Sequence, residues 1–118
     1  MFQMDEIARM RSAKRRRISS YDITGGNDDR KYIPGAGCIR HIWMTLANDG
    51  FVVEKYAHRK IVLRMYWDGE QEPSVEAPLG DFFGMGHGIT RNFVSAPLQM
   101  SPQDGQAMNS WWPMPYGN

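Results

Sequence analysis

This sequence has a single cysteine, no long apolar run and almost no excess of charge of either sign. Cys38 cannot form an intramolecular disulfide, and its apolar neighbours indicate a small buried thiol rather than a reactive one. No apolar run approaches the roughly 20 residues of a membrane span, and none follows the charged N-terminus as a secretory signal requires. The formal net charge of +1 gives no overall attraction to nucleic acid or membranes. We therefore expect a cytoplasmic protein with neither of these as a partner.

Glycine, proline and tryptophan, by contrast, are abundant. The 118 residues include 12 Gly, 7 Pro and 4 Trp. Because glycine and proline favour tight turns, this composition indicates short strands joined by many turns rather than a helical bundle. The length allows one domain at most.

The strongest strand prediction lies over residues 61–67, where only Arg64 interrupts an apolar run. A nearly continuous run of this kind is typical of a strand covered on both faces. Asp68-Gly69 predicts a turn, since glycine tolerates a positive φ. Polar and apolar residues alternate over 74–79, which predicts a second, half-buried strand. Pro73 and Pro78 cannot donate to a ladder, so this strand should lie at a sheet edge or start irregularly.

A glycine-rich loop over residues 80–88 follows this second strand. Its glycines surround two polar residues, Asp81 and His87, and two aromatic residues, Phe82 and Phe83. This pattern predicts a tight loop that carries polar tips between aromatic anchors.

Residues 5–17 predict the one helix of the chain. Asp5 can cap its first turn, and the basic run that ends at Arg17 suits its C-terminal end. Ile7 and Met10 give only a narrow apolar stripe, so the helix should dock weakly or pack on another chain. Its basic residues could bind nucleic acid. No aromatic residues are interleaved for base stacking, however, and a solvated helix end is the favoured interpretation.

Residues 18–36 predict a polar loop in which Asp22, Asn27 and Asp28 surround a glycine pair. Fixed oxygens of this kind can bind the hydroxyl groups of a polyol, or they can satisfy one another in a network of turns. Hard oxygen ligands also suit calcium, but their spacing does not match the helix-loop-helix calcium pattern. The residues alone leave the first two interpretations open.

Further strands are predicted over residues 38–45, 91–98 and 108–116. His41 in the first of them has no second His or Cys at ligand spacing, so we expect no metal, and we expect no cofactor. Trp111 and Trp112 should point to opposite faces of an extended chain. One of them could be a platform for sugar stacking, although a core aromatic is the favoured interpretation.

Four stretches of the chain carry a more specific signal. They are Ser19–Asp22 with Gly25–Asp28, Gly37–Thr45, Arg64–Gly88, and Met108-Asn109 with Pro113–Tyr116. In order and spacing they resemble glycoside hydrolase family 172, and the resemblance covers nearly the whole chain from about Ser19.

This resemblance implies an all-β fold, because members of the family carry a double jelly-roll. The expectation is a partial antiparallel jelly-roll β-sandwich of about five or six strands, preceded by one short N-terminal helix. Residues 1–17 would form the basic helix, and residues 18–118 an incomplete N-terminal jelly-roll. We expect such a chain to be marginally stable, oligomeric or aggregation-prone when isolated, because it leaves sheet edges and apolar faces uncovered.

The family's activities imply an α-furanoside substrate, either fructofuranosyl or arabinofuranosyl, and a trimer-based homo-oligomer. The resemblance also places Asp22, Asn27 and Asp28 at or near a sugar site. The alternative is a non-catalytic carbohydrate-binding or assembly module built from jelly-roll strands.

Glycoside hydrolysis generally uses two carboxyl groups, about 5–5.5 Å or about 6.5–9.5 Å apart. The acidic cluster over residues 68–72 occupies a hairpin tip, where a solvated turn is expected. Glu76, Asp81 and His87 are better candidates, as substrate-binding residues rather than catalytic ones. In the resembled family the catalytic glutamate pair lies downstream of these motifs, and no stretch here matches that region. The resemblance therefore implies a scaffold with part of a sugar subsite, and it leaves the catalytic residues unknown.

Overall fold

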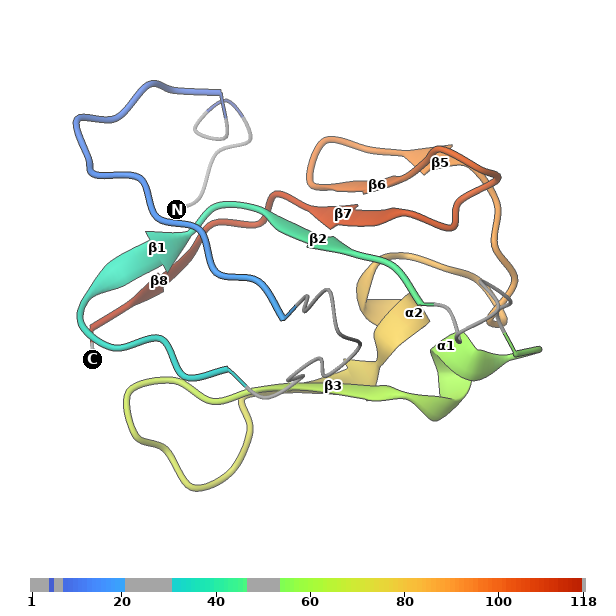
Figure 1. Cartoon of the computed structure of the whole chain (residues 1–118), viewed down its shortest axis with the longest axis horizontal. Helices are drawn as coiled ribbons and strands as arrows, with labels where there is room; N and C mark the ends of the chain where they lie inside the picture. The colour runs from blue at the N-terminus through green and yellow to red at the C-terminus, as the bar shows by residue number, and fades with distance from the viewer. Residues whose placement is uncertain (1–4, 6–7, 21–30, 47–53, 118) are drawn as a thin grey trace.

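The computed structural model describes residues 5, 8–20, 31–46 and 54–117, and this part of the chain consists mainly of short antiparallel strands (Figure 1). The strands are β1 (Gly37–Ile39), β2 (Ile42–Met44), β3 (Val62–Met65), β4 (Val75–Pro78), β5 (Phe93–Val94), β6 (Leu98–Met100), β7 (Met108–Ser110) and β8 (Met114–Tyr116). The two described helices, α1 (Ala57–Lys60) and α2 (Leu79–Phe82), are one turn each, too short to cross a membrane. The predicted all-β, antiparallel class is confirmed.

The strands form three antiparallel sheets. One has four strands in the order β2-β7-β6-β5, and the others pair β1 with β8 and β3 with β4. Figure 1 shows the four-stranded sheet as one layer, with α2 and the β3 strand in the layer beside it. This two-layer arrangement is a partial sandwich.

Three predicted strands are each divided in two. Residues 38–45 contain most of β1 and all of β2, which pair with the two halves of the last predicted strand, β8 and β7. Residues 91–98 hold β5 and the start of β6, which form a hairpin. Ser95 makes its turn, because its N–H donates to the Leu98 carbonyl at 2.8 Å and its Oγ accepts from the Leu98 N–H at 3.2 Å. Sequence reasoning missed this serine-based turn.

The inner face of the four-stranded sheet carries the core. Met44, Met108 and Met100 lie side by side in register across β2, β7 and β6. Leu79 and Phe83, from α2 and its end, complete the buried cluster together with Met85. The glycine-rich loop is therefore anchored by the side chains that fill the core, as its aromatic residues predicted.

The β3–β4 hairpin departs from its prediction on one point. Leu63 and Met65 face inward, whereas Val62 and Arg64 are exposed, with 44% of Val62 accessible. The apolar run is thus covered on one face rather than on both, since no described strand or helix packs on its outer side. The predicted turn is confirmed: Asp68 and Gly69 have φ of 50° and 78°, and the Glu70 N–H donates to the Trp67 carbonyl at 2.9 Å. The predicted edge position of β4 agrees with the two-stranded sheet that it forms with β3.

Two further expectations are wrong. Residues 8–17 form no helix, and Met10 is 94% exposed. A narrow apolar stripe with nothing to pack against cannot offset the cost of helix nucleation, and short isolated helices are marginal in water. Cys38 is exposed rather than buried, because β1 has only β8 as a partner and neither covers its side chain.

Candidate functional site

The glycine-rich loop is held by close packing of α2 on α1. A Cβ added to Gly80 would lie 2.9 Å from the Cβ of His58 and 2.9 Å from the Sδ of Met85, closer than real side-chain contacts allow. At this position only glycine lets the two helical turns approach. The backbone then turns at Gly84, whose φ is +87°, and brings Met85 back over the core.

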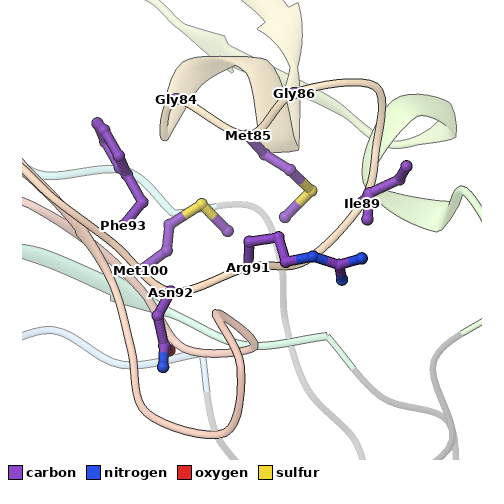
Figure 2. Close-up of a pocket in the computed structure, with 8 residues that line it drawn as sticks. All are labelled: Gly84, Met85, Gly86, Ile89, Arg91, Asn92, Phe93 and Met100. Atoms are coloured by element: carbon purple, nitrogen blue, oxygen red, sulfur yellow. The ribbon is translucent and has the colours of Figure 1, made fainter.

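A pocket of about 410 Å³ opens beside this loop. Its lining residues come from the loop, the segment that follows it and β6: Gly84, Met85, Gly86, Ile89, Arg91, Asn92, Phe93 and Met100. Figure 2 shows the Met85 and Met100 side chains pointing toward one another, with the Arg91 side chain running beneath Met85 toward the side of Ile89. The pocket therefore has apolar walls and a cationic group at its rim.

The backbone of Arg91 is held in place by a neighbouring turn. A Cβ added to Gly105 would lie 2.1 Å from the Arg91 carbonyl oxygen, so the 103–107 turn packs directly on this residue. The guanidinium donates to the Thr90 carbonyl at 2.8 Å, and Asp104 lies 3.8 Å away in an exposed ion pair. Most of its donors face solvent and the pocket mouth, where they can bind hydroxyl or carboxylate oxygens.

The two carboxylates predicted for the site, Glu76 and Asp81, do not line this pocket. Glu76 lies on the exposed face of β4 and pairs with its cross-strand neighbour Arg64 at 2.6 Å. That hydrogen bond first, and the charge of Glu76 second, raise the pKa of the Arg64 guanidinium above its ordinary value. Asp81 lies on α2 and pairs with Arg59 of α1 at 2.5 Å. Each carboxylate therefore pairs with a different arginine, and the two carboxylates do not lie together at the pocket.

His87 lies next to the pocket without lining it. It is exposed at the tip of the loop with a φ of 57°, between Gly86 and Ile89, which both line the cavity. His87 is thus at an exposed loop tip as predicted, whereas Asp81, the other predicted tip, lies in the helical turn α2 rather than in a loop. Asp22, Asn27 and Asp28 lie outside the described residues, so their predicted role stays a prediction.

Sequence reasoning missed two pocket residues, Arg91 and Asn92, because it assigned them to a strand. Their place directly after a glycine-rich loop was the available signal, since such loops position the residues that follow them. It also treated Glu70 as a solvated turn residue. The Glu70 carboxylate accepts hydrogen bonds from the Ser74 hydroxyl at 2.6 Å and from the Trp67 and Ser74 backbone N–H groups at 2.8 and 3.1 Å. These bonds, that of the Ser74 hydroxyl first, hold the pKa of Glu70 below its ordinary value.

His58 is the other residue that sequence reasoning missed. It is 2% exposed beneath Gly80, and its Nε2 is buried with no hydrogen-bond partner among the described residues. This burial lowers the pKa of His58, because it disfavours the charged imidazolium in the folded chain. We therefore expect protonation of His58 to weaken the α1–α2 contact that supports the loop.

These groups can bind a ligand, but the described pocket residues include no carboxylate for proton transfer. Within the described ranges, no three His, Cys, Asp or Glu side chains gather as a metal site would require. The arrangement suits a small neutral or anionic molecule with an apolar face and several oxygens.

A family model described as GH172 domain-like matches residues 13–118 of the chain. This match confirms the resemblance found in the sequence motifs. No curated protein matches the chain.

Proposed function

The chain belongs to the GH172 domain-like family, which is glycoside hydrolase-like, and from that premise we propose that it recognises α-furanosides. The sugar is an arabinofuranosyl or fructofuranosyl unit, bound in the pocket beside the glycine-rich loop. The acid and the nucleophile of hydrolysis come from outside the described residues. The described part of the chain then has a sugar-binding and scaffolding role in a glycoside hydrolase-like protein.

The character of the pocket supports this ligand. Its volume of about 410 Å³ lies within the roughly 300–1,000 Å³ range of small-molecule sites. Met85, Ile89 and Met100 offer apolar contact to the C–H face of a sugar ring. Arg91 brings a guanidinium group that can donate hydrogen bonds to hydroxyl oxygens. His87, at the tip of the loop, adds a polar group beside the mouth of the pocket.

The proposal that catalysis lies elsewhere is based on the pairing of Glu76 and Asp81 with arginines. A general acid must lie within hydrogen-bond reach of the bond that it protonates. Glu76 and Asp81 do not line the pocket, and each is held at hydrogen-bond distance by an arginine instead. Neither carboxylate is placed to donate a proton to a sugar in the pocket.

A hydrolysis assay tests this proposal. The purified chain is incubated with 4-nitrophenyl α-arabinofuranoside and with an aryl α-fructofuranoside, and the released phenol is measured. We expect no turnover by the chain alone. Turnover that Glu76→Gln or Asp81→Asn abolishes, and that the control Glu72→Gln leaves intact, would contradict the proposal, because a described carboxylate would then carry the chemistry.

A second candidate, an assembly module, is favoured by the apolar surface outside the pocket. Ile61, Val62 and Tyr66 are all exposed on or beside β3. We propose that copies of the chain associate, in a trimer-based assembly, through this side of the hairpin. Sedimentation of the wild type and of Val62→Lys would test it: a trimer that the substitution dissociates supports the candidate, and a monomeric wild type contradicts it.

A further inference from the structure

The outer face of the four-stranded sheet differs in character from its methionine-lined inner face. The strand register places Trp43 of β2 beside Asn109 of β7, Asn109 beside Gln99 of β6, and Gln99 beside Val94 of β5. Because residues paired in register share a face, these four side chains form one row across the sheet. The row holds one indole, two amides and one aliphatic side chain.

Trp43 is the most unusual member of this row. Its side chain is 59% exposed, and no described aromatic ring stacks on it. Its backbone is fixed by pairing with β7. A ligand that buries a large aromatic ring on a rigid strand removes a large apolar area from water. This burial would stabilise the complex.

His41 and Trp111 extend this surface at one end. Their rings stack in parallel, with centroids 4.8 Å apart and an angle of 3° between the planes. His41 Nε2 lies 2.9 Å from Asn109 Oδ1, a geometry in which the imidazole donates to the amide oxygen. Both contacts fix the orientation of the His41 ring and leave its Nδ1 as an acceptor without a partner among the described residues.

The amides are fixed in the same way. Asn109 is 8% exposed, and its Nδ2 donates to the Gln99 carbonyl at 3.4 Å. Gln99 Nε2 donates to Ser101 Oγ at 2.6 Å. Polar groups that are oriented before a ligand arrives lose less conformational freedom on binding, so this surface is preorganised.

We propose that this surface, the Trp43 face (Trp43, His41, Trp111, Asn109 and Gln99), binds the ring of a neutral sugar. The sugar ring lies on the Trp43 indole, and its hydroxyl groups bond to His41 Nδ1 and to the amide edge of Gln99. None of the five side chains carries a fixed charge, which favours a polyol over a phosphate, a nucleic acid or a charged peptide. The choice of a sugar among neutral ligands rests on the proposed function, whereas the face itself lies on the opposite side of the sheet from Met100, which lines the pocket.

Tryptophan and histidine NMR resonances of the full chain provide the test. Methyl α-arabinofuranoside and methyl α-fructofuranoside are titrated against the labelled protein, with methyl α-glucopyranoside as a second sugar class. We expect the Trp43 indole and His41 ring signals to shift on addition of a furanoside. Trp43→Ala should weaken that binding by about fivefold or more, since it removes the stacking partner. Trp43→Phe should retain most of it, and the control Trp112→Ala should leave it unchanged.

Different failures are distinguishable. Furanoside binding that shifts the His41 ring signal with the wild-type affinity in Trp43→Ala overturns the Trp43 face and leaves the proposed function standing. A response of Trp43 to the glucopyranoside and to neither furanoside supports the face as a sugar site and leaves furanoside recognition by the pocket standing. No response of Trp43 to any of the three sugars overturns the face. A Trp43→Ala effect on sedimentation alone also overturns it, since a second copy of the chain would then cover the indole.

Discussion

Gly80→Ala is the substitution that probes the support of the glycine-rich loop most sharply. The added methyl group would lie 2.9 Å from His58 Cβ and from Met85 Sδ. The Met85 sulfur can yield by a rotamer change, but His58 Cβ belongs to a buried residue of α1 and moves only with its backbone. Overpacking of this kind costs about 1–3 kcal/mol. Part of that cost is offset, because alanine is favoured over glycine in a helix by about 1 kcal/mol.

Gly86→Ala is the matched control within the same loop. No atom lies within 4 Å of a Cβ added there, and its φ is not in the left-handed region. We expect it to be neutral or to stabilise the chain by about 0.4–1 kcal/mol, through the entropy of the unfolded state.

The two variants are compared by thermal unfolding followed by circular dichroism. For a chain of this length, about 1 kcal/mol corresponds to about 4 °C in Tm. Gly80→Ala should therefore unfold several degrees below wild type, and Gly86→Ala at or above it. Equal Tm values for the two variants would refute the close α1–α2 contact on which the account of the loop rests.

Three further predictions concern the core, the hairpin and pH. Phe83→Ala should cost about 3–5 kcal/mol because its ring is fully buried, while Phe93→Ala at the pocket edge should cost less, as chemical unfolding would reveal. Glu70→Gln should lower the Tm and Glu72→Gln should not; because the pKa of Glu70 is depressed on folding, the difference should be fully present above the ordinary value of about 4.3 and should be lost as pH falls from there through the lower pKa of the folded chain. Burial lowers the pKa of His58, so below about pH 6.5 the unfolded chain takes up a proton that the folded chain does not. Wild type should thus lose more Tm than His58→Phe between pH 7.5 and 5.5, and equal losses would contradict that reasoning.

Periodicity and turn chemistry predicted much of this fold because they act locally. The strand over 61–67, the Asp68-Gly69 turn and the edge position of β4 each follow from residues within a few positions of one another. The helix over 5–17 was wrong for the converse reason: its sequence allows a helix, but stability depends on a packing partner that the sequence does not reveal.

The candidate site was harder to predict, since its parts meet only through long-range packing. His87 could be assigned to an exposed loop tip from its glycine neighbours. The arginine partners of Glu76 and Asp81 could not be predicted from the sequence, because Arg64 reaches Glu76 through strand register and Arg59 reaches Asp81 through helix packing. The Trp43 face depends in the same way on the order of four strands. The sequence shows alternation along one strand, but not which strands lie beside it.

The central claim is that the pocket beside the glycine-rich loop recognises an α-furanoside. Methyl-labelled methionine NMR tests it most directly, because Met85 and Met100 line the pocket and Met10 is exposed far outside the core. Titration with methyl α-arabinofuranoside and methyl α-fructofuranoside should shift the Met85 and Met100 signals saturably and leave Met10 unchanged. Signals of Met85 and Met100 that stay fixed at high concentrations of both furanosides would contradict the account.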